Sequence, residues 1–229
     1  MRRFALPFIA LALAACGAPT QTGEQQPGAA QAEAPVAHTA PAGRYTLDKA
    51  HSSLIVRVNH LGYSNFTARF ERWDGELTLD PAAPENSQIS VSIDPRSIAS
   101  DNPPDGFIDI MRGARFLDAA RFPAISFRST SIERTGPNTA RITGELTLHG
   151  VTKPVTLEGR FNGGYEGMHL DPHARVGFSA HGSFNRADFG MTMGIPAPGT
   201  TMGVSDAVDV AFETEFSGPD WIAPPATAP

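Results

Sequence analysis

Apolar and polar residues alternate with a period of two through most of this chain. In the segment 54–60, Leu54, Val56 and Val58 fall on one face of an extended chain and Arg57 falls on the other. The same alternation recurs in eight further segments, namely 66–70, 76–79, 89–93, 125–132, 142–148, 155–161, 176–180 and 208–216. The pattern predicts about nine strands, each with one buried face.

Turn signals separate these segments, at Asp74-Gly75, Gly136-Pro137, His149-Gly150 and Asn162-Gly163-Gly164. Helical patterns are scarce, and we expect only short helical turns at 107–112, 114–120 and 186–189. Many amphipathic strands with few helices indicate an all-β fold, which is either a sandwich or a closed barrel. The alternation does not separate these two architectures. Small residues on the predicted inner face fit an open interior and close packing equally well, and they are Ala68, Gly144, Gly159 and Ala180.

The first residues resemble the signal of a bacterial lipoprotein. Arg2 and Arg3 precede an apolar stretch of about a dozen residues, which is too short to cross about 30 Å of hydrocarbon. The stretch ends in Leu13-Ala14-Ala15-Cys16-Gly17, which resembles a lipobox and implies cleavage after residue 15 and lipidation of Cys16. The alternative is an ordinary secretory signal with a chance cysteine. Because the residue after Cys16 is not Asp, we expect an anchor on the periplasmic side of the envelope, in the outer membrane.

Composition divides the rest of the chain into three zones. The zone 16–43 begins with Cys16, and its other 27 residues are rich in Ala, Pro and Gln. They predict a disordered linker, whose mean span at about 5–6 Å × √27 is on the order of 30 Å. Residues 44–217 hold nearly all the branched and aromatic side chains and predict one domain. Residues 218–229 return to Pro and Ala and predict a disordered tail.

Charge and cysteine content narrow the chemistry further. The chain has 18 Lys and Arg against 24 Asp and Glu, a formal net charge of −6, and no basic cluster. Phosphate contacts need clustered cations, so we expect no nucleic-acid partner. Cys16 is the one cysteine, and once it is lipidated the domain has no thiol for a disulfide, for catalysis or for a metal.

Several segments, taken in order, resemble the YceI-like family of polyisoprenoid-binding periplasmic proteins. They are Tyr45-Thr46-Leu47-Asp48, Val58-Asn59-His60-Leu61-Gly62-Tyr63-Ser64, Trp73-Asp74-Gly75, Arg115-Phe116-Leu117-Asp118-Ala119-Ala120-Arg121-Phe122-Pro123, Ile142-Thr143-Gly144-Glu145-Leu146-Thr147-Leu148-His149-Gly150-Val151-Thr152-Lys153-Pro154-Val155, Arg186-Ala187-Asp188-Phe189-Gly190-Met191 and Val204-Ser205-Asp206-Ala207-Val208. The resemblance implies one antiparallel lipocalin-like β-barrel of about eight strands. It also implies an apolar cavity for a long isoprenoid or fatty chain, and it brings no catalytic residue and no cofactor.

We expect the ligand to contact side chains on the inner face of the strands and of the short helical segments. These cavity-facing candidates are Val56, Val58, His60, Phe66, Phe70, Val91, Ile93, Phe107, Phe116, Phe127, Leu146, Leu148, Leu157, Phe178, Phe189, Val210 and Phe212.

Catalytic and metal-binding patterns in the chain are weak. Ser179 sits in a near match to a nucleophile elbow, but His181 replaces the second glycine and the segment is a strand. His169 and His173 lie four residues apart, yet no helix is predicted to bring them onto one face, so we expect a pair of loop residues and no metal site.

Three polar or flexible features have two interpretations each. His51 and His60 lie near strand ends, where we expect hydrogen bonds to turns or inside the barrel in preference to acid–base chemistry. Arg186 and Asp188 predict a local ion pair that fixes a turn, and the alternative is a polar clamp on a ligand head group. The segment 191–202 predicts a surface hairpin loop, and the alternative is a flexible flap over the cavity.

The favoured function is non-catalytic binding, sequestration or transport of a long-chain lipid in the cell envelope. The lipid could be a polyisoprenoid, an isoprenoid quinone or a fatty-acid derivative. One alternative is a barrel enzyme acting on a lipid, which would need convergent titratable groups at the cavity. Another is a surface interaction lipoprotein with a filled core, and a homodimer stays open in each case.

Overall fold

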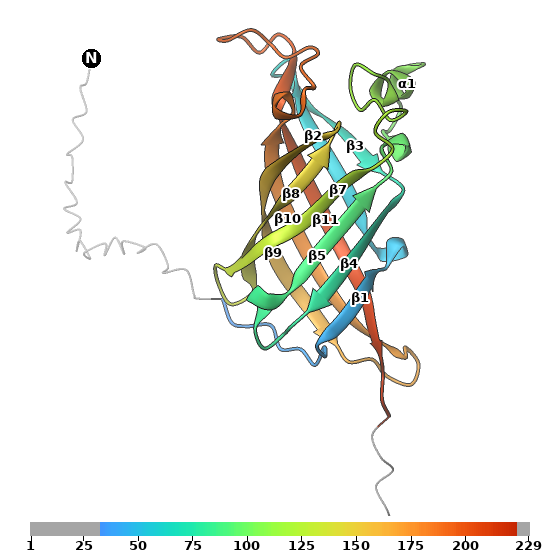
Figure 1. The fold of residues 1–229 in the computed structure, drawn as a ribbon, viewed down its shortest axis with the longest axis vertical. Coiled ribbons are helices and arrows are strands. Elements are labelled where there is room, and N and C mark those ends of the chain that lie inside the picture. Colours follow the sequence, from blue (N-terminus) through green and yellow to red (C-terminus); the bar gives the residue numbers. More distant parts are fainter. Residues whose placement is uncertain (1–32, 224–229) are drawn as a thin grey trace, which may run out of the picture. The chain divides into compact units, whose positions relative to one another are not determined.

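The computed structural model of this chain describes residues 33–223. Figure 1 shows long tilted strands wound into a barrel. The chain divides into two units, Met1–Ala32 and Glu33–Pro229, and the second unit contains every strand of the barrel. The predicted signal, Cys16 and the first part of the predicted linker lie outside the described residues.

Strands make up most of the described chain, and the helices between them are short. In chain order the elements are β1 (Gly43–Leu47), η1 (Lys49–His51), β2 (Ser53–His60), β3 (Ser64–Phe70), β4 (Trp73–Leu79), η2 (Pro84–Asn86), β5 (Gln88–Ile93), η3 (Pro95–Ser97), β6 (Ile98–Ala99), α1 (Phe107–Arg112), β7 (Ile125–Arg134), β8 (Thr139–Leu148), β9 (Val151–Tyr165), β10 (His173–Asn185), η4 (Arg186–Phe189) and β11 (Val204–Asp220). No helix within residues 33–223 has the length and apolar composition that crossing a membrane requires.

One continuous antiparallel sheet closes on itself. The hydrogen-bonded order is β1-β4-β5-β7-β8-β9-β10-β11, and β1 also pairs with β11 through Thr46 opposite Ser217. Closure distinguishes a barrel from a sandwich, because a sandwich keeps two separate sheets. The predicted eight-stranded antiparallel barrel is therefore confirmed.

Three of the eight strand positions are broken into two segments, which explains why the sheet holds eleven strands. The two segments β1 and β2 share one position beside β11. The segments β3 and β4 share the next position, and β5 and β6 share the one after it. The turn η1 is capped by Asp48, whose side chain accepts from the amide of Ala50. Asp94 caps η3 in the same way by accepting from the amide of Arg96. A short side-chain acceptor satisfies the free amide where each strand stops.

Two of the three expected helical turns are present, and one is not. Residues 107–112 form α1 and residues 186–189 form η4. Residues 114–120 form non-helical turns instead. Gly113 ends α1 in an extended conformation, and Asp118 has a positive φ of 43° that a right-handed helix does not tolerate.

Beside the predicted domain 44–217, the structure also describes residues 33–43 and 218–223. Residues 33–42, here called the N-terminal strap, lie against the barrel, and Ala40 is buried. The buried side chain of Asn138 accepts from the amide of Val36 at 2.7 Å and donates to the carbonyl of Ala34 at 2.8 Å. Strand β11 likewise runs on to Asp220. The strap therefore has hydrogen-bonding partners in the barrel despite its linker-like composition.

The barrel has two different ends in Figure 1. The upper end carries α1 and the loop between β10 and β11, and the lower end carries β1. At the lower end Tyr45, Val176 and Phe216 are almost completely buried. The hydroxyl of Tyr45 donates to the carbonyl of Pro41 at 2.7 Å, which ties the strap to β1.

Candidate functional site

The upper half of the barrel encloses a cavity of about 480 Å³, here called the upper cavity. Its wall comes from the inner faces of the strands and from the segment around α1. Phe107 and Met111 of α1 face it, followed by Phe116 and Leu117. The ring of Phe107 packs edge-on against Phe66 of β3, with centroids 5.4 Å apart. A void of this size is unusual in a close-packed interior and falls in the range of ligand pockets.

The wall of the upper cavity is apolar except at one end. Among the described residues that line it, the polar side chains are His60, Ser64 and Arg186. His60 ends β2 and pairs with Ser64, which begins β3. His60 also pairs with Val204 at the start of β11, and Arg186 directly follows β10. The three polar groups therefore gather at the upper end of the cavity, here called the mouth.

Arg186 is buried and holds the loop between β10 and β11 in place. Its guanidinium donates to the carbonyls of Ser205, Met191, Met193 and Val204, all at 2.8 to 2.9 Å. Burial lowers the pKa of Arg186, but an arginine starts so high that it stays charged. The expected ion pair of Arg186 with Asp188 is wrong, because the donors of the guanidinium face carbonyl groups of the loop.

A second cavity of about 290 Å³, here called the lower cavity, occupies the other half of the barrel. Pro35, Val36 and His38 of the N-terminal strap form part of its wall. The ring of His38 packs edge-on against Phe161, with centroids 5.0 Å apart. The strap thereby covers the lower end of the barrel, so that this end differs from the mouth above.

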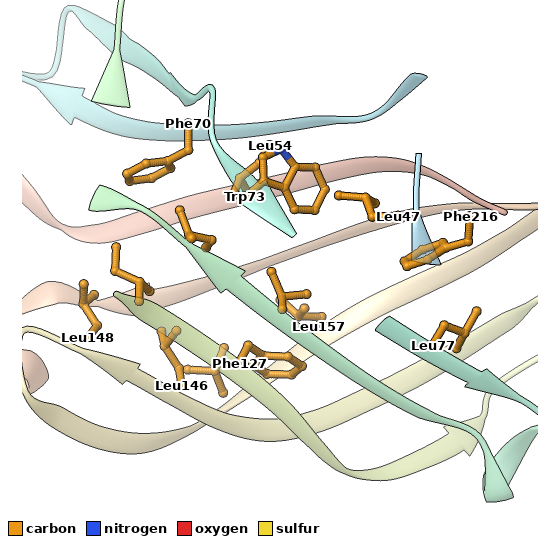
Figure 2. Packing of buried hydrophobic residues seen from close by; sticks show 14 of the residues in the cluster. Leu47, Leu54, Phe70, Trp73, Leu77, Phe127, Leu146, Leu148, Leu157 and Phe216 are labelled. Atoms are coloured by element: carbon orange, nitrogen blue, oxygen red, sulfur yellow. The ribbon is translucent and has the colours of Figure 1, made fainter. Parts of the chain in front are cut away.

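Four residues line both cavities and form a waist between them. They are Val91, Phe127, Leu157 and Phe212. Figure 2 shows Phe127 and Leu157 between Leu146 and Leu148 toward one end and Leu77 and Phe216 toward the other. Trp73 packs edge-on against Phe212 at 5.9 Å and stiffens the waist. An apolar chain that entered the mouth would meet this constriction before the lower cavity.

The structure places all the cavity-facing candidates at one cavity or the other, except Phe189. Phe178 lines the lower cavity, and the remainder line the upper cavity or the waist. Phe189 is instead packed against Phe184 with centroids 5.3 Å apart and is only 1% exposed. The prediction for Phe189 is wrong because η4 turns its ring into the wall, where β-strand alternation does not apply.

Several wall residues are not among the cavity-facing candidates. The alternation does predict Leu54 and Ala68 on the inner face of their strands, and the structure shows that both line the upper cavity. Val36 and His38 of the strap could not be found, because their surroundings have the composition of a linker.

The other candidate chemical groups take part in local structure. The hydroxyl of Ser179 accepts from Asn162 and donates to Glu213, in the middle of β10. His173 contacts Asp220 at 3.0 Å, and the described part of the chain shows no metal-binding cluster that contains His169 or His173.

A different set of possible metal ligands lies at η1 and comprises Asp48, His51 and Glu215. Asp48 already accepts from His51 at 2.9 Å and from Arg175 at 2.6 Å. Asp48 therefore acts as a helix cap within an ion-pair network. His51 bonds to this turn, which agrees with the hydrogen bond to a turn expected for it.

The chain resembles known proteins in sequence and in fold. The YceI-like domain model matches residues 45–216. A UPF0312 protein of Pseudomonas putida (strain W619) is 41% identical over 177 residues, which cover 76% of this chain and 87% of the relative.

Two solved structures share the barrel. BcnA of Burkholderia cenocepacia superposes with a TM-score of 0.61 at 22% identity, over 74% of this chain and 98% of that one. A polyisoprenoid binding domain from Saccharophagus degradans superposes with a TM-score of 0.53 at 16% identity, over 78% of this chain and 100% of that one. At these identities the two structures support the fold alone. The family model and the relative together show that the chain belongs to the YceI-like family.

Proposed function

We propose that the barrel binds a long apolar lipid without changing it chemically, and that it sequesters or carries this lipid in the cell envelope. One observation carries the proposal: the upper cavity is apolar throughout except for His60, Ser64 and Arg186 at its mouth. A cavity with this distribution of polar groups suits an amphiphile whose tail enters first. A polyisoprenoid, an isoprenoid quinone and a fatty-acid derivative all have this form.

The driving force for such binding is the hydrophobic effect. Each Å² of apolar surface removed from water contributes roughly 25 cal/mol, so a long hydrocarbon chain gains several kcal/mol on entering. An empty apolar cavity also forfeits dispersion contacts that a chain would restore. The name of the Saccharophagus degradans neighbour, a polyisoprenoid binding domain, points to the same class of ligand for a barrel of this fold.

A barrel enzyme receives less support from the site. Catalysis would need titratable groups that converge on the reacting atoms. Among the described residues that line the upper cavity, His60 and Arg186 are the ionisable ones, and four donors of Arg186 already bind carbonyls. We therefore favour non-catalytic lipid binding over an enzymatic reaction on the lipid.

The location of the protein is part of the proposal. The lipobox-like segment that ends at Cys16 supports export, cleavage and attachment of acyl chains to Cys16. Several acyl chains hold a protein firmly to a bilayer. A carrier fixed in this way would stay beside a lipid source, which fits sequestration or transport in the envelope.

The decisive experiment extracts the protein with organic solvent and identifies the lipid by mass spectrometry. The chain from Glu33 on contains the whole described barrel and lacks Cys16, so the acyl chains of the anchor do not contribute to the extract. We expect a long-chain lipid in a ratio of about one per barrel. A protein that is repeatedly empty and whose melting temperature does not respond to added lipids would contradict the proposal.

A matched pair of variants on β3 separates the cavity from the outer surface. Ala68 is buried and lines the upper cavity, whereas the neighbouring Thr67 is exposed on the outside. Ala68→Trp fills part of the cavity, so we expect the bound lipid to fall at least about fivefold, the equivalent of about 1 kcal/mol. Thr67→Trp adds the same ring outside and should leave the lipid content unchanged. Equal lipid in both variants would place the lipid elsewhere.

A further inference from the structure

Two uncharged hairpin tips project from the upper end of the barrel beside the cavity mouth. The first is the turn 61–63 between β2 and β3, and the second is the segment 190–203 between η4 and β11. Neither tip contains Asp, Glu, Lys, Arg or His. The exposed side chains on them include Tyr63, which is 81% exposed, Met202 at 65% and Met193 at 41%.

The two tips form one surface, here called the apolar tip. The amide of Leu61 in the first turn donates to the carbonyl of Gly203 in the second segment at 2.8 Å. Residues at the two tips also line the upper cavity, namely His60 and Ser64 on either side of the first turn, Met191 within the second segment and Val204 directly after it. The exposed apolar surface is thus continuous with the mouth.

The apolar tip has a fixed base. Arg186 donates to four carbonyls at the two ends of the second segment, and the amide of Val204 donates to the carbonyl of Gly194 at 2.7 Å. These bonds fix the backbone at both ends of the second segment, and Met193 and Met202 are exposed on it. Large exposed apolar side chains on a fixed loop indicate a surface that binds something apolar.

The exposed apolar side chains at the lower end lie in a different setting. Met168 and Leu170 are exposed in the loop between β9 and β10, but Glu166 and Asp171 flank them. Charged groups resist removal from water, so this loop is poorly suited to enter a bilayer. It serves as a matched control for the apolar tip.

We propose that the apolar tip inserts into the interfacial region of a lipid bilayer and docks the mouth of the barrel on it. The inference rests on the proposed function, because a lipid can then pass between bilayer and cavity without crossing water. Insertion of uncharged residues avoids the cost of dehydrating charges. Tyrosine suits the interface, since its ring is apolar and its hydroxyl stays hydrated. No cation belongs to the apolar tip, so docking should not depend on anionic lipids.

The test is co-sedimentation of the chain from Glu33 on with vesicles of pure phosphatidylcholine. We expect binding that changes little when the salt concentration is raised from low to high, because screening acts on charges. The double variant Tyr63→Ser, Met202→Ser should bind at least about tenfold more weakly. The control Met168→Ser, Leu170→Ser should bind like the unmodified chain. Thermal unfolding of each variant first establishes that the barrel is intact, so that a loss of binding reports on the surface.

Other outcomes would overturn the docking proposal. Binding that is absent, that is equal in the two double variants, or that appears only with anionic lipids and vanishes in salt would each contradict it. Concentration-dependent dimers that the Tyr63→Ser, Met202→Ser variant abolishes, without vesicle binding, would assign the apolar tip to a second copy of the chain. If extraction finds lipid in the barrel while vesicles fail to bind, docking fails and the proposed function stands. If vesicles bind through the apolar tip but the barrel is empty, docking stands and the carrier function fails.

Discussion

At the scale of single residues, Asp48 joins three parts of the barrel at the break between β1 and β2. Its carboxylate accepts from the amide of Ala50 at 3.0 Å, from His51 and from Arg175 of β10. The hydrogen bond from His51 lowers the pKa of Asp48 to about 2, and Arg175 acts in the same direction against partial burial. One charged acceptor therefore caps η1 and ties it to the wall.

This network predicts a specific dependence of stability on pH. The pKa of Asp48 is lower in the folded state than its ordinary value of 3.8, so its contribution is complete above about pH 4 and is lost as the pH falls toward 2. Because the group is near the surface, we expect Asp48→Asn to cost on the order of 1 kcal/mol at pH 7. Urea unfolding of both proteins from pH 7 to pH 2 measures the difference. A gap that stays constant across this range would show that Asp48 is not the titrating group.

At the scale of elements, alternation predicts strands well and their interruptions poorly. Strand β2 follows the alternation because each side chain faces either the cavity or water. Phe189 is as apolar as the cavity-facing residues of the strands, but it lies in η4. Its ring packs against Phe184 and does not line a cavity. Composition does not predict the N-terminal strap, because the strap bonds to Asn138, which lies 102 positions from Val36 in the sequence.

The strap offers a test of that long-range dependence. Asn138→Ala removes the hydrogen bonds to the amide of Val36 and the carbonyl of Ala34, so we expect a loss of about 1–3 kcal/mol in the free energy of unfolding. Hydrogen exchange should show faster exchange in residues 34–40 while the amides of the barrel strands stay protected. Asn162→Ala, at an exposed asparagine, serves as the control. Unchanged protection in the strap of the Asn138→Ala variant would contradict the role of this side chain.

At the scale of the whole molecule, the two ends of the closed barrel differ. The lower end is covered by the strap, and the upper end has a polar mouth beside the apolar tip. The barrel class follows from the sequence pattern and the family motifs. The sequence does not predict the waist or the apolar tip, because each is formed by residues from distant strands that meet in space.

The proposed anchor adds a prediction at this scale. Mass spectrometry of the protein isolated from its native membrane should find a mature chain that begins at an acylated Cys16. Cys16→Ala removes the thiol, so we expect that variant to keep its signal segment and to carry no lipid on the chain terminus. Normal cleavage of the variant would instead indicate an ordinary secretory signal.

The central claim is that the lipid tail lies inside the barrel with its polar end at the mouth. The most direct measurement is photo-crosslinking. A fatty acid that carries a diazirine near its methyl end is bound to the chain from Glu33 on, the complex is irradiated, and the labelled residues are mapped. The tail should label inward-facing residues below the mouth, such as Phe127, Leu146 and Leu157, which line the upper cavity. Labelling should fall when Ala68→Trp occupies the cavity. Labels confined to outward-facing residues, or to the apolar tip alone, would contradict the account.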